Sequence, residues 1–295
     1  AMSLVSLLFI NACGHRGPGD VEGLFDAGFL TAGDHATALG PTEQIPYLAR
    51  QSRLTFARVG ITDPVSLEDY QAHGGYEGLA KALELDGAQI VDIVTESGLR
   101  GRGGAAFPTG IKWRTVLGAE GAQKYVTCNA DEGDSGTFAD RMIMESDPFA
   151  LIEGMTIAGL AVGATEGYVY LRTEYPLAIE IMNEAIGIAE SAGLLGENVM
   201  NGGQAFRLEV REAAGAYICG EETSMLESLE GKRGIIRYRP PLPAIKGLFG
   251  APTIVNNVIT LASVPIIMAR GSKYYQDYGT GRSRGTKGTE QAAAP

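Results

Sequence analysis

The sequence predicts an α/β fold in which a mostly parallel sheet is flanked by helices. Three short segments, 125–128, 167–171 and 206–210, are expected to be strands, and the first of them has the composition of a buried strand. They alternate with apolar or amphipathic segments of helical length at 149–162 and 176–192. Alternation of this kind is typical of βαβ units, and 295 residues with 45% apolar content can bury a core of this size. We therefore expect a Rossmann-like parallel sheet.

The expected helices carry start and stop signals. The pair Asp147-Pro148 precedes the first of them, and proline suits the first helical position. Gly193 follows the second, where glycine commonly ends a helix. A glycine-rich turn after the third strand leads into a further expected helix at 221–230.

The regions around this core differ in character. Residues 1–50 are glycine-rich and weakly periodic, which predicts an irregular segment. Residues 51–97 predict a helical lead-in, and 98–278 the α/β domain. Residues 279–295 are rich in Gly, Thr and Ala and predict a disordered tail. The apolar spacing that indicates the lead-in is carried by Leu79, Leu83, Ile90, Ile93 and Val94.

Composition excludes several classes of function. A formal net charge of −11 disfavours nonspecific binding of nucleic acid, although local amides and a few basic side chains can still bind an anionic cofactor. The apolar stretch 4–10 is too short to span a bilayer and lacks a basic leader, so we expect a cytoplasmic protein without membrane insertion. Cys13, Cys128 and Cys219 lie too far apart for a disulfide framework or a complete metal site, and each is expected to be a small buried hydrophobe.

The densest motif is the glycine loop, residues 98–113, with the sequence G-L-R-G-R-G-G-A-A-F-P-T-G-I-K-W. It lacks the G-K-[ST] of a P-loop, and no strand precedes it as in a dinucleotide fingerprint. Its glycines can bring backbone amides close to a ligand, its basic side chains supply charge, and its aromatic residues can stack on a ring. The motif predicts either a phosphate-binding loop or a surface turn with solvated arginines.

An acidic run, residues 128–137 with the sequence C-N-A-D-E-G-D-S-G-T, directly follows the first strand. Open parallel sheets bind ligands outside the carboxyl ends of their strands, so this position suits a site. Its carboxylates can accept hydrogen bonds from sugar hydroxyls. An acidic loop without a ligand and a site for a hard cation remain as alternatives, although the spacing is not that of an EF-hand.

Two further motifs follow the third strand. The sequence G-A-Y-I-C-G-E-E-T at 215–223 places Glu221 and Glu222 in the first turn of a helix, where a simple capping pair explains them as well as a cofactor does. The prolines of Y-R-P-P-L-P-A at 238–244 form a stiff wall, and T-I-V-N-N-V at 253–258 offers two amides. Each is typical of loops and caps when taken alone.

Together and in this order, the four motifs resemble the flavoprotein subunit of respiratory complex I and its relatives. Those relatives are the diaphorase subunit of NAD-reducing hydrogenases and the beta subunit of NAD-dependent molybdenum formate dehydrogenases. The resemblance extends over 46–286 and implies FMN and NAD(H) as cofactors. It also implies an oxidoreductase of NADH dehydrogenase type, a diaphorase module that exchanges hydride between NAD(H) and FMN and passes electrons to or from iron–sulfur partners.

The resemblance also assigns roles to residues. It implies that Phe107 stacks on the nicotinamide nucleotide at its adenine end, and that Glu222 is the catalytic residue beside the reacting rings. Asp134 stands where a glutamate contacts the nicotinamide cofactor in the family. Tyr217, Gly220, Glu221 and Glu222 are assigned to the cofactor pocket. The residues assigned to FMN are Gly98, Arg100, Gly101, Arg102, Gly103, Lys112, Asn129, Asp131, Glu132, Val255, Asn256 and Asn257.

Details of the sequence favour the formate dehydrogenase branch. Asp134-Ser135-Gly136 replaces the Glu-Pro-Gly of complex I, and 53–58 and 283–286 also look like that branch. The implied partners are a thioredoxin-like 2Fe–2S subunit and a larger catalytic subunit with iron–sulfur clusters and molybdenum. A complex I or hydrogenase subunit is the alternative within the family.

Full-length relatives continue into a β-grasp domain and a helical bundle that holds a 4Fe–4S cluster. Neither region is found in this sequence, so we expect a truncated chain with any 4Fe–4S cluster in the absent part. Residues 1–50 are then expected to be the remnant of a thioredoxin-like domain. A non-catalytic fragment or docking scaffold is the alternative from another class of function.

Overall fold

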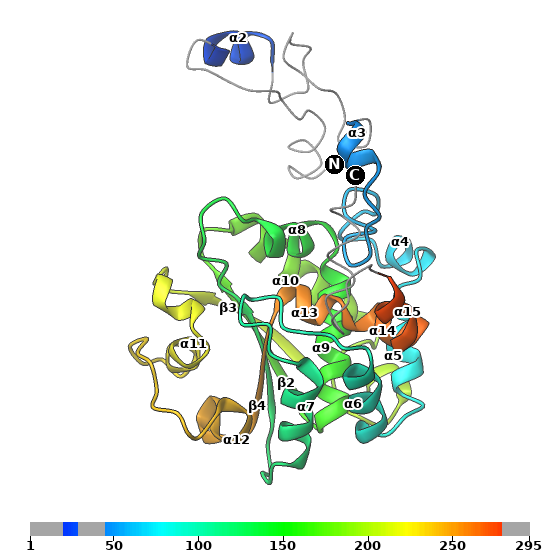
Figure 1. The fold of residues 1–295 in the computed structure, drawn as a ribbon, viewed down its shortest axis with the longest axis vertical. Helices are drawn as coiled ribbons and strands as arrows, with labels where there is room; N and C mark the ends of the chain where they lie inside the picture. The colour runs from blue at the N-terminus through cyan, green and yellow to red at the C-terminus, as the bar shows by residue number, and fades with distance from the viewer. Residues whose placement is uncertain (1–19, 29–44, 279–295) are drawn as a thin grey trace.

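The computed structural model describes residues 20–28 and 45–278, with a four-stranded parallel sheet at the centre. Helices cover both faces of this sheet (Figure 1). The predicted α/β fold, a parallel sheet flanked by helices, is therefore confirmed. In spatial order the strands are β3 (Arg207–Ala213), β2 (Glu166–Arg172), β1 (Tyr125–Ala130) and β4 (Thr253–Asn257).

The strand register aligns the carboxyl ends of the strands at one edge. Tyr125 at the start of β1 pairs with Glu166 of β2 and with Thr253 of β4. The chain moves outward from β1 through β2 to β3 and then returns to place β4 on the other side of β1. The strand order thus reverses between β1 and β4. A parallel sheet leaves a crevice for ligands at such a reversal.

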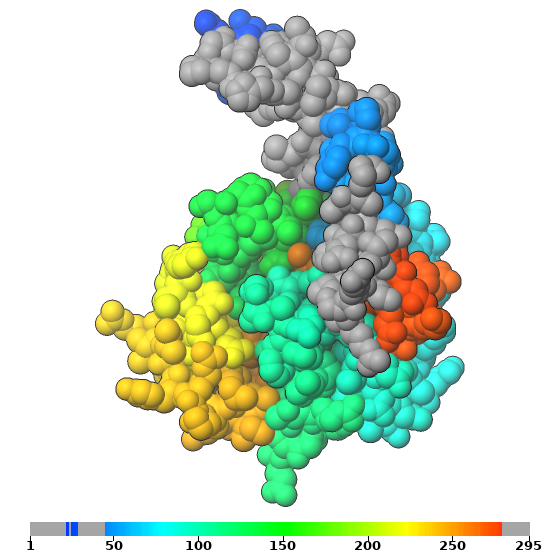
Figure 2. Space-filling model, viewed as in Figure 1, coloured from blue at the N-terminus to red at the C-terminus, as the bar shows by residue number. Residues whose placement is uncertain are grey.

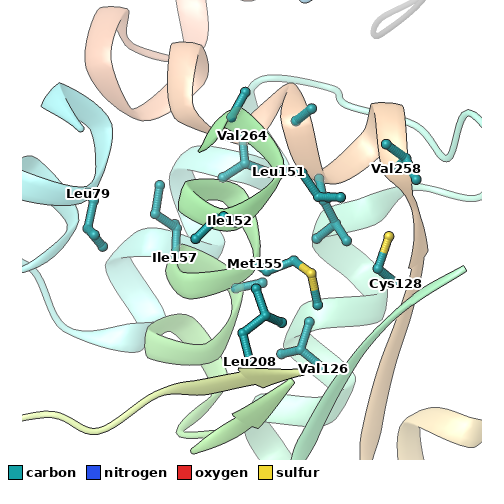
Figure 3. Packing of buried hydrophobic residues seen from close by; sticks show 14 of the residues in the cluster. Leu79, Val126, Cys128, Leu151, Ile152, Met155, Ile157, Leu208, Val258 and Val264 are labelled. Carbon is teal, nitrogen blue, oxygen red and sulfur yellow. The ribbon is translucent and has the colours of Figure 1, made fainter. Parts of the chain in front are cut away.

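Helix α9 (Pro148–Val162) forms the centre of the main core. It is buried along its whole length and lies between the sheet and an outer layer of helices. Figure 3 shows Met155 of α9 close to Val126 and Leu208 of the sheet. A Cβ at Gly154 would lie 2.1 Å from the carbonyl oxygen of Leu261, so this glycine allows α13 (Val258–Ala262), the helix that contains Leu261, to pack directly on α9. The outer layer contains α5 (Glu77–Ala82), α6 (Gly87–Glu96), α7 (Thr109–Gly118), α13 and α14 (Val264–Arg270).

The opposite face of the sheet carries a smaller core. Alternate strand residues point to opposite faces, so Tyr170 and Val255 face away from α9 and pack with Met225 and Leu226. The covering elements are α11 (Glu222–Leu229), α12 (Pro243–Lys246) and η5 (Leu248–Gly250). This thinner layer leaves room beside β4 for a ligand.

The lead-in packs into the main core through a buried carboxylate. Glu153 of α9 is fully buried and accepts hydrogen bonds from the Tyr70 hydroxyl at 2.6 Å and from the backbone amides of Tyr76 and Leu79. Arg58 adds an ion pair with Asp147 at 2.9 Å. Bonds to a charged acceptor are stronger than neutral ones, so this network fixes residues 58–79 to the α/β core.

The remaining helices of the described residues lie at the periphery or connect the elements around the sheet and α9. Helix α8 follows the acidic run, and α10 follows β2. These elements are α2 (Asp20–Asp26), α3 (Pro46–Ala49), α4 (Leu67–Ala72), α8 (Ala139–Ser146), α10 (Pro176–Ser191), η3 (Val199–Asn201), η4 (Tyr217–Gly220) and α15 (Ser272–Asp277).

Several elements differ from the sequence prediction. Residues 253–257, expected to be a loop, form strand β4, because Ile254 and Val255 are buried on the two faces of the sheet. The glycine loop ends in helix α7, and α8 has no counterpart among the predicted elements. The predictions for the irregular segment up to residue 19 and from 29 to 44, for Cys13 and for the tail 279–295 lie outside the described residues. No helix in the described part of the chain is long and apolar enough to cross a bilayer.

Candidate functional site

Two adjoining hollows lie at the carboxyl ends of β1 and β4, where the strand order reverses. Their volumes are about 470 and 530 Å³, within the usual range for ligand pockets. In Figure 2 the teal glycine loop, the green loop after β1 and the yellow turn at 215–221 adjoin on the face toward the viewer. The hollows have five lining residues in common, so they form one continuous cleft: Gly103, Asn129, Gly220, Glu221 and Asn257.

The glycine loop folds back on itself before it enters α7. The Gly101 amide donates to the Phe107 carbonyl at 2.9 Å, and the Thr109 amide donates to the Leu99 carbonyl at the same distance. A Cβ at Gly103 would lie 3.2 Å from the Cβ of Asn257, so the loop backbone presses against the end of β4. A side chain at this position would be in tight contact with Asn257, which supports a structured wall of the cleft rather than a surface turn with solvated arginines.

The basic residues of this loop have different surroundings. Arg100 donates to the loop carbonyl of Ala106 at 3.1 Å, and the Arg102 side chain donates to the Tyr275 hydroxyl at 2.8 Å. Lys112 points into the cleft, where its Nζ lies 2.7 Å from the Val255 carbonyl oxygen. Lys112 is therefore the loop cation best placed for a ligand.

Glu222 lies between two cations at the smaller hollow. Its carboxylate is 3.3 Å from Lys112 Nζ and 3.0 Å from the Arg239 guanidinium. The neighbouring Glu221 instead caps α11, with Oε2 accepting from the amides of Thr223 and Ser224 at 2.9 Å each. Burial opposes ionisation of Glu221, but these hydrogen bonds outweigh it and hold its pKa below the usual range. Glu221 therefore caps α11 and also lines both hollows, whereas Glu222 faces the smaller hollow alone.

The acidic run closes the larger hollow. The Asn129 amide donates to the Gly220 carbonyl at 2.8 Å and accepts from the Asp131 amide at 3.2 Å, which ties β1 to the turn at 215–221. Asp131 Oδ2 is buried without a hydrogen-bond partner among the residues that the structure describes. Burial raises the pKa of Asp131 to about 6, against the opposing effect of Arg172. A buried carboxylate oxygen without a donor, beside a cavity, is an acceptor for a ligand hydroxyl.

The other two carboxylates of this run, Glu132 and Asp134, already accept hydrogen bonds from other residues of the chain. Glu132 caps α8 by accepting from the amides of Asp140 at 3.0 Å and Arg141 at 3.2 Å. Asp134 accepts from the Tyr217 hydroxyl at 2.9 Å. Both residues line the larger hollow, but their own hydrogen bonds leave less capacity for a ligand than Asp131 has.

The two asparagines at the end of β4 are held by the surrounding chain. Asn256 Oδ1 accepts from the buried Trp113 indole at 2.9 Å. Asn257 caps α13 by accepting from the Thr260 amide at 3.1 Å, and its own Nδ2 donates to Asp140. Fixed amides of this kind form a rigid corner of the cleft.

The structure brings most of the predicted site residues together. Gly98 and Arg100 line neither hollow. The residues that do line the cleft are Gly101, Arg102, Gly103, Phe107, Lys112, Asn129, Asp131, Glu132, Asp134, Tyr217, Gly220, Glu221, Glu222, Val255, Asn256 and Asn257. Their contacts with a cofactor remain predictions.

Sequence reasoning missed Asp140 and Thr260. Asp140 lines the larger hollow, and the Thr260 hydroxyl accepts from the Arg102 backbone amide at 2.8 Å. Thr260 follows Asn257 by three positions, the spacing of a helix cap, which is a signal that could have been used. Asp140 lies only three residues beyond the acidic run but carries no motif of its own.

Comparison with known proteins gives consistent matches. A family profile described as the Nuo51 FMN-binding domain matches residues 94–266. The NADP-reducing hydrogenase subunit HndC of Solidesulfovibrio fructosivorans is 51% identical over 238 residues, which cover 81% of this chain and 48% of the relative. A subunit of the NADH-quinone oxidoreductase of Rhizobium meliloti is 53% identical over 230 residues, covering 78% of this chain and 55% of that relative.

A solved structure agrees with these relatives. A chain of the NAD+-reducing [NiFe]-hydrogenase in the H2-reduced state superposes with a TM-score of 0.66 at 30% sequence identity. The match covers 94% of this chain and 47% of that one. The chain thus spans about half the length of the proteins it matches.

Proposed function

The chain belongs to the family of the Nuo51 FMN-binding domain, and on that premise we propose that it is the FMN- and NAD(H)-binding diaphorase module of an electron-transfer complex. The module exchanges hydride between NAD(H) and FMN and passes electrons to or from iron–sulfur partners. One observation carries the proposal. The cleft at the strand reversal combines a close-approaching glycine loop with the unpartnered, buried Oδ2 of Asp131.

The residues of the cleft fit FMN. Gly101 and Gly103 allow backbone amides to approach a phosphate, and Lys112 supplies a positive charge. Asp131 Oδ2 accepts a hydrogen bond from a sugar-alcohol hydroxyl. The Asn256 amide, which Trp113 holds in place, forms a fixed polar part of the cleft wall. When bound, FMN supplies the conversion between hydride exchange with NAD(H) and single-electron transfer to iron–sulfur centres.

The exposed side of the smaller hollow, at Phe107 and Arg239, is the proposed place of the nicotinamide nucleotide. Phe107 lines it with about half of its side chain exposed, which leaves a ring face free for stacking. Arg239 lies at 40% exposure beside Glu222 and can exchange this partner for a phosphate. Glu222, held from both sides by cations, then orients the reacting end of the dinucleotide and excludes water from it.

We propose further that the parent complex is an NAD-dependent formate dehydrogenase in the cytoplasm. The support is the resemblance of 53–58, 283–286 and the Asp134-Ser135-Gly136 run to that branch. The partners are then a thioredoxin-like 2Fe–2S subunit and a larger iron–sulfur and molybdenum subunit. Within this chain, 98–278 is proposed as the cofactor-binding unit and 51–97 as its helical lead-in. Native purification of the complex, assayed with formate, hydrogen and quinone, distinguishes the branches.

Diaphorase activity tests the module itself. The chain loaded with FMN is expected to oxidise NADH with ferricyanide as the electron acceptor. Glu222→Gln should lower kcat by about tenfold, because it removes the charge between the two cations. Glu212→Gln on the exposed part of β3 is the matched control and should leave the rate unchanged. A sample with bound FMN that does not oxidise NADH contradicts the proposal.

A further inference from the structure

Asp140 is a buried carboxylate at the cleft to which neither the sequence motifs nor the family resemblance assigns a role. It lies in the first turn of α8, is 5% exposed and lines the larger hollow. Both of its carboxylate oxygens accept from Asn257 Nδ2, at 2.7 and 2.8 Å. The amide group of Asn257 therefore has its donor side turned to Asp140.

The other side of the same amide is connected to the glycine loop. Asn257 Oδ1 accepts from the Thr260 amide at 3.1 Å and lies 3.3 Å from the Thr260 hydroxyl. That hydroxyl accepts from the Arg102 backbone amide at 2.8 Å. Hydrogen bonds thus run without a break from the loop through Thr260 and Asn257 to Asp140.

We propose that Asp140 is a positioning residue of the cofactor cleft, which in its ionised form fixes the Asn257 amide and, through it, the wall where the glycine loop meets β4. This inference rests on the proposed function for its ligand, FMN, but the contact itself is a property of the chain. A neutral acid offers a weaker acceptor than a carboxylate and turns a hydroxyl toward the Asn257 donor. Protonation of Asp140 therefore loosens this wall.

The surroundings bring this protonation into an accessible pH range. Burial and the nearby Glu132 raise the pKa of Asp140 to about 7, while Asn257 and the Ile259 amide oppose the rise. The elements packed against α8 are α9, α10 and α13, and α13 has no ionisable side chain. The other ionisable side chains on these elements and around the larger hollow are Arg141 and Glu145 on α8 itself, Cys128 on β1, Asp131 and Asp134 after β1, Arg102 in the loop, Asp147 and Glu153 on the α9 side, Tyr175 before α10, and Glu180, Glu184 and Glu190 on α10.

The test compares FMN affinity of the wild-type chain and Asp140→Asn by flavin fluorescence between pH 5.5 and 8.5. At pH 8 the variant should bind FMN about tenfold more weakly, because it loses hydrogen bonds to a charged acceptor. The ratio of the two affinities should approach one below about pH 6, where the wild-type carboxyl is also neutral. The phosphate of FMN titrates near the same pH but cancels in this ratio. Asp92→Asn, an exposed carboxylate paired with Arg114, is the control and should match wild type.

If wild type and Asp140→Asn bind FMN with equal affinity at every pH, the proposal is overturned. A variant that binds FMN more weakly by the same factor at every pH also overturns it, because that result shows a structural effect that does not depend on the charge of Asp140. If Asp140→Asn does not fold, NMR of the flavin-free wild-type chain decides. The side-chain amide resonances of Asn257 should then shift with a midpoint near pH 7, and a resonance that does not move overturns the contact. A wild-type chain that binds no FMN refutes the proposed function instead, and the NMR titration still decides the role of Asp140.

Discussion

Replacement of Asp131 by Asn separates ligand binding from folding. Within 20–28 and 45–278, Asp131 Oδ2 has no hydrogen-bond partner, and burial raises the pKa of Asp131 to about 6. An Asp in an unfolded chain has a pKa of about 3.9, so ionisation of Asp131 opposes folding. This cost grows as the pH rises from about 4 to about 6 and then stays constant. At pH 8 the Asp131→Asn chain should therefore be at least as stable as wild type.

FMN binding should respond in the opposite direction. A hydrogen bond from a ligand hydroxyl to a charged acceptor contributes about 1.5–3 kcal/mol. Since about 1.4 kcal/mol corresponds to a tenfold change in Kd, Asp131→Asn should weaken FMN binding by roughly 10- to 100-fold. Fluorescence titration at pH 8 measures the affinity, and urea unfolding of the flavin-free chain measures the stability.

The combination of the two results decides the role of Asp131. Asp92→Asn serves as the control, because its carboxylate is exposed and lies far along the chain from the acidic run. An Asp131→Asn chain that binds FMN within about twofold of wild type refutes the proposed acceptor role. If Asp131→Asn lowers both the free energy of unfolding and the FMN affinity, the carboxylate has a structural role.

Three further predictions concern other contacts of the chain. Glu153→Ala should lower the free energy of urea unfolding by about 3 kcal/mol, because three buried donors lose their acceptor; an unchanged midpoint would contradict the network. Gly103→Ala should weaken FMN binding by about fivefold with little change in Tm, because a Cβ would lie 3.2 Å from the Asn257 Cβ and displace the loop; unchanged affinity shows that the loop has room. Arg239→Ala should raise the KM for NADH about fivefold and leave FMN affinity unchanged, because Arg239 contacts Glu222 at the exposed side of the smaller hollow; steady-state kinetics and flavin titration measure both, and a loss of FMN affinity places Arg239 in the FMN site.

The sequence predicted the parts of the fold that depend on local pattern. Strands β1 and β2 contain short apolar and aromatic segments, whereas β3 alternates apolar with charged residues, and both patterns are typical of strands. The glycine loop, the acidic run and the turn at 215–221 could be placed at a site because parallel strands end at a common edge. The assignment of individual residues to FMN or NAD(H) depended on the family resemblance, since glycines and carboxylates alone also suit turns and caps.

Other features depend on contacts between distant parts of the chain. Strand β4 has only five residues, too few for periodicity to separate it from a loop, and it forms because β1 pairs with it. The partner of Asp140 is 117 positions away, and the Arg102 amide finds Thr260 at a separation of 158 positions. No local pattern encodes such pairs. The contact between the Arg102 side chain and the Tyr275 hydroxyl spans 173 positions, and the assignment of Arg102 to FMN stays a prediction.

The most direct test of the proposed function is an anaerobic titration of the FMN-loaded chain with NADH, followed by visible absorption. The cleft should hold about one FMN per chain. The flavin absorption band at about 450 nm should bleach with about one equivalent of NADH. A folded chain that retains no FMN contradicts the assignment of the cleft. Bound flavin that stays oxidised in excess NADH contradicts the exchange of hydride between the two cofactors.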